Sequence, residues 1–505
     1  MNKKNKTKRK KRIFSKYHSV SRTKRKKTRR RYSYKPVRKN RRKEKIRGIY
    51  SVKNSQKPKE VCVENTPQII APILTSDNFE QEGKEEVAKD VDTKDNNIAT
   101  AHSSIMDNHD KGIEGEDFVS ELASEAYLKY WCYPNPIDEE GDKKEICDLL
   151  IVFFDTAIII SVKNYDNMGN YERYKRKVIE KSTNQLFGAE RKLFNSNRTI
   201  KIKHPKHGEF VFTPSDYKQV HRITVNVGEQ FEKYELIDTK ENKGCINILN
   251  KESFEAITTE LDTIKDLTEY LLIRESLFLK NRGIQTHCSE KDLLAYYLMN
   301  NREFSQECFS GNFEEWTISC NGKWDTYLSS RSVLLKKLAD EKSYFIDELI
   351  KNDVLPLEHG ERFAKELMTL SRFERRNIAN NLYEMLQKYQ GTDNDFSRRH
   401  HITENGTLFL YVYYPPKEKS EDVDAMLDRA AELYGYKYQP KRVLYLGVTD
   451  NLKQWKFGLT EFKDDEFENL TKGQIEFYEN VIAKAGWFSN MKITQVENKE
   501  YPDEE

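Results

Sequence analysis

The sequence predicts an α/β protein in which a mixed β-sheet is flanked by helices, with a C-terminal α+β region after it and a disordered basic arm before it. From residue 112 onwards, apolar runs too short for helices alternate with segments of helical periodicity, which favours a sheet covered by helices. Residues 1–50 instead hold 25 lysines and arginines against one acid, Glu44, and cannot bury a core. We expect four segments: the disordered basic arm 1–60, an acidic and polar linker 61–110, an α/β domain 111–285 and the C-terminal region 286–505.

The charge of the chain is strongly asymmetric. The first 50 residues carry a net charge of +24, and since the whole chain carries +4, the remainder carries −20. A basic, low-complexity arm is typical of segments that neutralise the phosphates of a polyanion; the alternatives are a solvated tail or a localisation signal.

The composition also indicates the cellular compartment in which the protein is expected. No run of about 18 apolar residues occurs, so no membrane span is expected. The seven cysteines form no CxxC motif, which indicates a reducing compartment. We therefore expect a cytoplasmic protein of a bacterium.

The periodicities predict the elements in chain order. In the α/β domain we expect a helix over 112–131, a hairpin over 146–164, a helix over 171–195, strands over 209–212, 220–227 and 245–249, and a helix over 261–272. In the C-terminal region we expect helices over 293–299, 332–338, 344–350 and 361–387, and strands over 408–414 and 442–448.

The hairpin carries the most chemical information. Its two apolar runs flank the polar pair Asp155-Thr156, which reads as a two-residue turn. Phe154 would then pair with Ala157, and counting outward places Asp148 directly opposite Lys163, with their Cβ atoms roughly 5 Å apart. A carboxylate and an ammonium group would thus meet at the open end of an apolar ribbon, the kind of site that metal-dependent phosphodiesterases use. The alternative is an ordinary cross-strand ion pair, worth less than about 1 kcal/mol when exposed.

This pattern resembles the PD-(D/E)xK nuclease superfamily, the restriction-endonuclease-like fold, over roughly residues 112–285. In that family an acid on a helix precedes an Asp that opens a strand, and (Asp/Glu)-x-Lys lies on the next strand. Asp148 and Lys163 match the Asp and the Lys, and Gln185 with Ala189 matches the Gln-x-x-x-Ala motif of the following helix. One departure is Ser161, which stands where the second acid is expected and is a poor ligand for Mg²⁺.

The resemblance implies a migrated acid on the preceding helix. On a helical wheel Glu116 lies about 70° and Glu125 about 110° from the centre of the apolar face, so Glu116 is the first candidate for a metal ligand and Glu125 the second. The alternative for both Glu116 and Glu125 is a surface acid on the flank of a helix. In the family, the glutamine matched by Gln185 supports the lysine or contacts the DNA backbone; otherwise it is a surface amide.

Basic side chains on the same helical stretch are candidates for phosphate contacts. They are Lys175, Arg176, Lys177 and Arg191. As a charge run they are equally a solvated helix face. The basic helical run with Arg372, Arg375 and Arg376 either contacts nucleic acid or pairs with acids of the body, and the sequence does not choose between the two.

The expected function is Mg²⁺- or Mn²⁺-dependent hydrolysis of phosphodiester bonds in nucleic acid, with DNA as the expected substrate. Asp148 and a helix acid would bind the metal, Lys163 would orient water or stabilise charge, and Gln185 would support them. The alternative is a catalytically inactive nuclease-like module that binds nucleic acid or protein, in a defence or toxin system. Ser161 motivates this alternative.

Overall fold

The protein is described by a computed structural model that covers residues 96–502 except 167–168, 196–197, 229–235, 241–243, 281–284, 305–308, 311–316, 393–395, 404, 464 and 490–498. The predicted basic arm 1–60 lies outside the described residues, as does the linker up to residue 95. The predicted mixed α/β architecture, with helices flanking the sheets, is confirmed.

The first sheet has six strands in the order β1-β2-β3-β6-β8-β7. The strands β1, β2 and β3 form an antiparallel meander, β3, β6 and β8 run parallel, and β7 closes the edge antiparallel to β8. The bounds are β1 (Cys132–Pro134), β2 (Leu149–Phe153), β3 (Thr156–Lys163), β6 (Gln219–Asn226), β7 (Ile237–Lys240) and β8 (Gly244–Asn250). A separate hairpin consists of β4 (Ile200–His204) and β5 (Gly208–Phe212).

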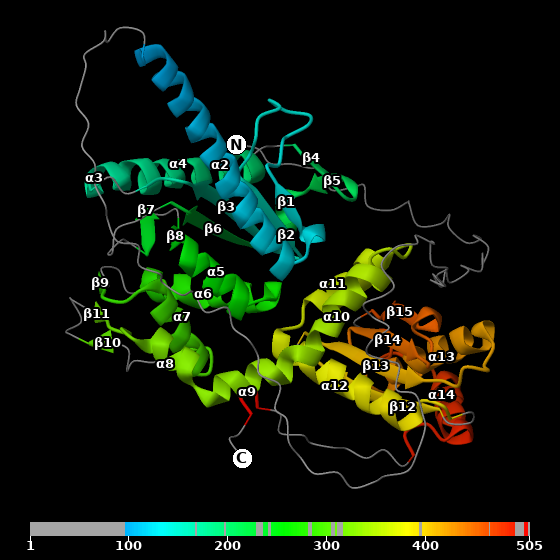
Figure 1. Ribbon diagram of the computed structural model, residues 1–505. Helices are drawn as coiled ribbons and strands as arrows, with labels where there is room; N and C mark the ends of the chain where they lie inside the picture. Colours follow the sequence, from blue (N-terminus) through cyan, green and yellow to red (C-terminus); the bar gives the residue numbers. More distant parts are fainter. Residues whose placement is uncertain are drawn as a thin grey trace, which may run out of the picture.

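Helices cover both faces of this sheet (Figure 1). One face packs against α2 (Asn96–Ala126), α5 (Lys251–Glu260) and α6 (Ile264–Lys280). The other face packs against α4 (Lys181–Phe194), which follows α3 (Tyr171–Tyr174) and the π-helical turn η2 (Lys175–Glu180). Because β2 and β3 are covered on both faces, nearly all their residues are buried, which explains their uninterrupted apolar runs.

The predicted helix over 112–131 differs at both ends. Helix α2 begins at Asn96, inside the predicted linker, and ends at Ala126. Leu128 then takes a positive φ of 64° and the chain continues as the 3-10 turn η1 (Lys129–Trp131), which leads into β1. The strands predicted over 209–212, 220–227 and 245–249 are confirmed as β5, β6 and β8, while β4 and β7 have no predicted counterpart.

The single helix predicted over 361–387 is wrong. Two helices occupy this stretch, α11 (Gly360–Met368) and α12 (Arg372–Tyr389). Ser371 starts the second helix as an N-cap whose side chain accepts a hydrogen bond from the Glu374 N–H, and the Glu374 carboxylate accepts one from the Ser371 N–H. Such a capping box begins a new helix and lets it leave in a new direction.

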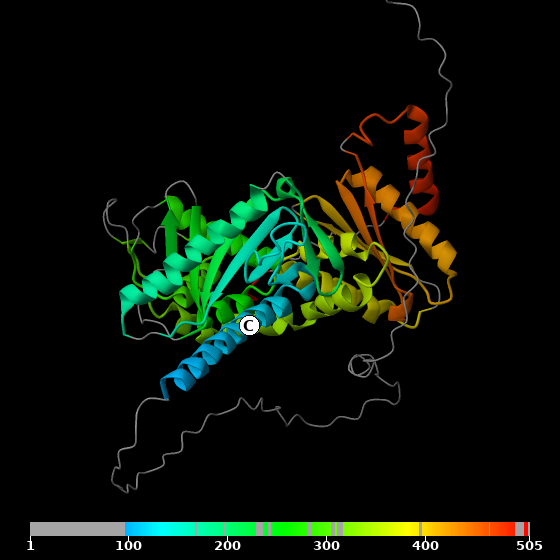
Figure 2. The same ribbon diagram turned by 90° about the horizontal axis from the view of Figure 1, so that it is seen from above.

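A second sheet of four strands forms the far part of the molecule, in the order β12-β13-β14-β15. Helices α10 (Tyr344–Leu349), α11 and α12 lie on one face and α13 on the other, and Figure 2 shows α13 and α14 at the end of the molecule far from α2. The bounds are β12 (Ser397–Ile402), β13 (Thr407–Tyr413), β14 (Arg442–Val448), β15 (Lys456–Glu461), α13 (Ser420–Tyr438) and α14 (Lys472–Ala485).

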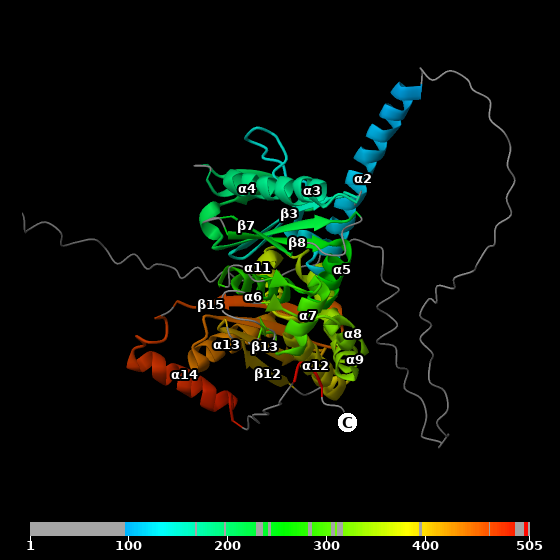
Figure 3. The same ribbon diagram turned by 90° about the vertical axis from the view of Figure 1, so that its left-hand side faces the viewer.

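The two sheets share one apolar core. A single cluster of buried side chains runs from Val119 of α2 through the first sheet and the intervening helices to Phe409 and Phe457 of the second sheet. Figure 3 shows these layers following one another from α4 to α14. The connecting elements are β9 (Gln285–Thr286), α7 (Glu290–Met299), β10 (Phe309–Ser310), β11 (Thr317–Ile318), α8 (Lys323–Ser329), α9 (Arg331–Asp340) and α10 (Tyr344–Leu349).

Candidate functional site

The β2–β3 hairpin turns one residue earlier than predicted. Phe153 pairs with Thr156 and Val152 pairs with Ala157, so the loop is Phe154-Asp155 and the predicted pairing of Phe154 with Ala157 is wrong. Phe154 takes a positive φ of 48° and leaves the ladder, while Thr156 is buried in β3. The polar side chain of Thr156 next to Asp155 suggests a loop, but its β-branched side chain fits a buried strand well.

This shift changes the residue opposite Asp148. Continuing the observed register by one pair beyond Leu149–Ile160 puts Asp148 beside Ser161, and the predicted pairing with Lys163 is wrong by two residues. A shift of two residues keeps the same sheet face. The Nζ atom of Lys163 accordingly lies 3.7 Å from Oδ2 of Asp148, and the side chains of Lys163 and Asp148 are 15% and 16% exposed.

Ser161 connects the two charged groups. Its hydroxyl donates to Oδ2 of Asp148 at 3.2 Å and accepts from Nζ of Lys163 at 2.8 Å. The same Oδ2 accepts a hydrogen bond from the Val162 N–H, and Nζ also donates to the carbonyl of Val162 at 2.7 Å. The serine that departs from the family pattern therefore holds the lysine and the aspartate in place.

Glu116 approaches this pair from helix α2. The helix comes close to the strand ends because Gly115 has no side chain: a Cβ there would lie 2.8 Å from Cγ2 of Val227, inside normal contact distance. Burial raises the pKa of Glu116 and the charge of Asp148 raises it further, while a hydrogen bond with Asn135 and the charge of Lys163 oppose the rise.

Glu145 is the site residue that the sequence reasoning missed. Desolvation of its carboxyl group, followed by the charges of Asp148 and Glu116, raises the pKa of Glu145 to about 7, and its carboxyl group also hydrogen-bonds with Asp148. The residue as a whole is exposed, and the neighbouring carboxylates disfavour a further negative charge on it. The usable signal was its position three residues before Asp148, in the loop that enters β2.

Glu125 does not join this group. It lies nine residues after Glu116 on α2, about 13 Å along the helix axis, and it is exposed. Glu116, Glu145 and Asp148 are thus near enough for their charges to influence one another, and the charge of Lys163 acts on both glutamates. Within the described part of the chain, however, no three or more His, Cys, Asp or Glu side chains stand as a ready group of ligands for one metal ion.

Helix α4 borders the lysine. Burial lowers the pKa of Lys163, the charge of Asp148 raises it, and the charge of Lys181 at the start of α4 lowers it. Gln185 follows one turn later with an exposed side chain, and the structure gives it no contact with Lys163. The family role of Gln185 stays a prediction.

The predicted phosphate-contacting residues lie on the outside of the α3–η2–α4 stretch. Arg176, Lys177 and Arg191 are exposed and Lys175 is half-buried. Lys192 on the same stretch donates to Asp142 at 2.7 Å and is already paired. Exposed cations on one helix leave both predicted roles open.

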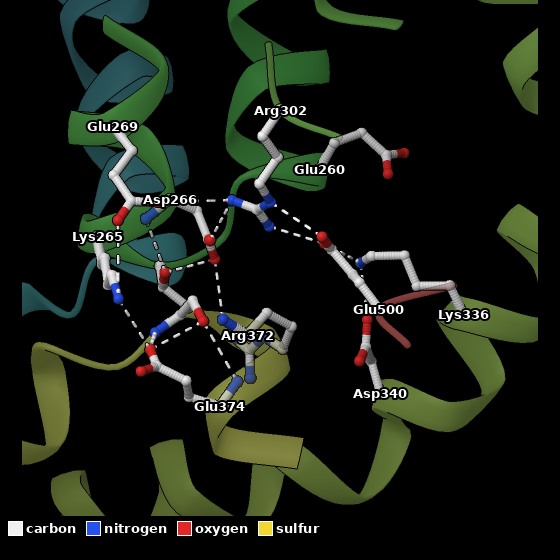
Figure 4. Close-up of polar contacts among 12 residues, drawn as sticks. Glu260, Lys265, Asp266, Glu269, Arg302, Lys336, Asp340, Arg372, Glu374 and Glu500 are labelled. Carbon is white, nitrogen blue, oxygen red and sulfur yellow. Dashed lines mark hydrogen bonds and ion pairs between the residues drawn. The ribbon is translucent and has the colours of Figure 1, made fainter. Parts of the chain in front are cut away.

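The arginines of α12 pair with acids of the body, which decides between the two alternatives for this run. Arg372 binds Asp262 at 2.8 Å and Asp347 at 2.6 Å, and Arg375 also pairs with Asp347. Both arginines are buried. Figure 4 shows Arg372 in a larger junction with Asp266, Arg302 and Glu500.

Comparison with protein-family models, with curated proteins and with solved structures gave no match to this chain. Among the described residues, every helix is too short or too polar to cross a membrane.

Proposed function

We propose that the chain is a metal-dependent nuclease of restriction-endonuclease-like fold that hydrolyses phosphodiester bonds in nucleic acid, with DNA as its expected substrate, in the bacterial cytoplasm. The observation that carries the proposal is the surplus of negative charge where β2 begins and β3 ends. Asp148 lies beside Lys163, and its charge contributes to the raised pKa values of two further carboxyl groups, Glu116 and Glu145. A divalent cation would relieve this repulsion.

The order of elements supports the same proposal. Helix α2 carries Glu116, Asp148 immediately precedes β2, Lys163 ends β3, and α4 carries Gln185. This is the order of the PD-(D/E)xK motifs. Glu116 or Glu145 would replace the motif acid, whose position is occupied here by Ser161.

The donor chemistry fits Mg²⁺ or Mn²⁺, because these ions prefer carboxylate oxygens and retain several waters. Asp148, Glu116 and Glu145 would hold the ion, and water ligands would complete a set that the side chains alone do not form. When bound, such an ion polarises a phosphate and lowers the pKa of water.

The residues of the chain have separable tasks in this proposal. Lys163, held by Ser161, presents its ammonium group beside Asp148 and would neutralise charge on a bound phosphate. Lys175, Arg176, Lys177 and Arg191 would contact flanking phosphates, and Gln185 the backbone. The basic arm would raise the local concentration of the chain on nucleic acid.

The test is cleavage of plasmid DNA, single-stranded DNA and RNA by the full chain, with Mg²⁺, Mn²⁺ or EDTA. Asp148→Asn and Lys163→Ala are expected to lower cleavage at least about a hundredfold, as expected when transition-state charge stabilisation is lost. The opposite end of the same strands offers matched controls: Lys218 lies 3.9 Å from Asp155 and both are exposed, so Lys218→Ala and Asp155→Asn should cleave normally. Cleavage that survives in both site variants would refute the proposal.

A second candidate is the non-cleaving module, favoured by Ser161 and by the lack of a ready ligand group among the described residues. It predicts binding to nucleic acid or to a protein, with no metal-dependent cleavage of any of the three substrates. In that case Mn²⁺ would also leave the melting temperature unchanged. The metal-dependent enzyme instead predicts a rise in melting temperature with Mn²⁺ that Asp148→Asn abolishes.

A further inference from the structure

Two cysteines, Cys288 and Cys320, lie where β9 and β11 lead into helices α7 and α8, the elements labelled in Figure 1. The strands are parallel, with Gln285 opposite Thr317 and Thr286 opposite Ile318. The ladder continues with a hydrogen bond from the His287 N–H to the Ile318 carbonyl at 3.0 Å. The same offset of 32 residues places Cys288 opposite Cys320.

The side chains of the two cysteines are in contact. The thiol of Cys320 hydrogen-bonds to the sulfur of Cys288, and the Cys320 N–H points to the same sulfur. These two donors hold the pKa of the Cys288 thiol below its ordinary value. Both cysteines belong to a small apolar cluster with Leu293 and Ile318, and neither forms a disulfide in this structure.

The surrounding backbone holds the pair in place. Ser289 caps α7 through a capping box with Asp292, and Asp292 also accepts a hydrogen bond from the Trp324 N–H of α8 at 3.0 Å. The Lys323 N–H donates to the Cys320 carbonyl at 3.1 Å. The two sulfurs are thus fixed near each other by contacts that do not involve them, which favours a bond between them.

Access to the two sulfurs is unequal. Cys288 is partly exposed, whereas Cys320 is 1% exposed. A partly exposed thiol with a favoured thiolate is the attacking group in thiol–disulfide exchange, and a buried neighbour is the resolving group. The other described cysteines, Cys132, Cys147 and Cys245, are buried and burial raises the pKa of each.

We propose that Cys288 and Cys320 form a reversible disulfide and are the redox-modification site of this chain, with low-molecular-weight disulfides as the oxidant. The thiolate of Cys288 attacks one sulfur of the small disulfide and releases one small thiolate. Cys320 gives up its proton to that thiolate, attacks the Cys288 sulfur and releases the second small thiolate, which takes up from solvent the proton that Cys288 had lost. Two protein thiols and one small disulfide thus become one protein disulfide and two small thiols.

The consequence is a covalent link between the start of α7 and the turn that precedes α8. It closes a loop that contains residues outside the described part of the chain, between β9 and β11. The inference stands independently of the proposed nuclease activity, because the pair touches none of the candidate site residues.

The experiment is oxidation of the full chain with oxidised glutathione across a series of glutathione redox buffers, followed by trapping of free thiols and mass spectrometry. Chymotrypsin cleaves after Trp316 and so separates Cys320 from Cys308, which lies outside the described residues. We expect one linked pair of peptides, Cys288 with Cys320, reversed by dithiothreitol. Cys132, Cys147 and Cys245 should remain free.

Two variants assign the order of attack. Cys320→Ser should stop the reaction at a glutathione adduct on Cys288, whereas Cys288→Ser should leave Cys320 unmodified. Cys245→Ser, a buried thiol outside the pair, should oxidise as the wild type does. A link from Cys308 to either sulfur, or no linked peptide at any buffer ratio, would overturn the proposal.

Discussion

Gly115 determines how closely α2 approaches the ends of β3 and β6. Gly115→Ala should crowd Val227, and this overpacking should lower the free energy of unfolding by about 1–3 kcal/mol. The higher helix propensity of alanine should raise it by about 1 kcal/mol. We expect a net loss of about 1 kcal/mol and weaker Mn²⁺ binding, because Glu116 moves with the helix. A Cβ at Gly112 on the same helix would meet no atom within 4 Å, so Gly112→Ala should gain up to about 1 kcal/mol. Urea unfolding of both variants gives the comparison, and equal effects would contradict it.

Glu145 makes stability depend on pH. Its pKa in the folded chain is about 7, above its ordinary value near 4.5, so the folded state binds this proton more tightly than the unfolded state. Its contribution is therefore fully present below about pH 4.5 and is lost as the pH rises through 7. Because the residue is exposed, we expect a loss of only about 1 kcal/mol.

Glu145→Gln should remove that loss. Urea unfolding of the wild type and the variant at pH 5 and pH 8 gives the difference. The variant should be the more stable of the two at pH 8, and the gap should close when Mn²⁺ is added to the wild type. Identical pH profiles would show that the carboxyl groups do not interact in solution.

At the scale of elements, the cap at Ser371 turns one predicted helix into two. Ser371→Ala removes the hydroxyl that accepts a hydrogen bond from the Glu374 N–H. We expect the free energy of unfolding to fall by about 1–2 kcal/mol. The loss should be near the upper end of this range because Arg372 and its neighbours are buried behind the cap. The same capping box at Thr471 starts α14, in which no residue is buried. Thr471→Ala should therefore cost about 0.5 kcal/mol. Guanidinium unfolding compares the two, and the reverse order would contradict the argument.

Sequence periodicity predicted most elements but not how they meet. The apolar runs of β2, β3, β13 and β14 identified strands because burial on both faces demands such runs. The hairpin register depended on the backbone of one residue, Phe154, and no pattern reports a positive φ at a phenylalanine. Glu145 was missed for a related reason: it belongs to a loop, where side-chain direction follows no period.

At the scale of the whole molecule, the described residues on either side of position 285 share one core and one ionic junction. Arg302 binds Glu500 through two hydrogen bonds, at 2.8 and 3.0 Å, and Asp266 through one at 2.6 Å. Arg376 donates to the carbonyls of Lys499 and Glu500. These contacts join segments far apart in the sequence, as Figure 4 shows for Glu500.

We expect the described core to unfold in a single calorimetric transition, because neither sheet can lose the shared core alone. Glu500→Gln should lower the midpoint of that single transition, with a loss of about 2 kcal/mol from a partly buried charge pair. Glu476 forms an exposed pair with Lys472 on α14, and Glu476→Gln should leave the midpoint unchanged. Two separate transitions would show that the segments before and after residue 285 fold independently.

The ionic junction also affects the order in which parts of the chain can fold during synthesis. Asp266 emerges 36 residues before Arg302 and 106 residues before Arg372, and the hydrogen bonds between Arg302 and Glu500 span 198 residues. A nascent chain that has already made the first sheet therefore carries acids whose counter-charges do not yet exist. Closing contacts of such long range is slow. We therefore expect the face of the first sheet that packs against the second half to stay hydrated on the ribosome until much of that half has been made.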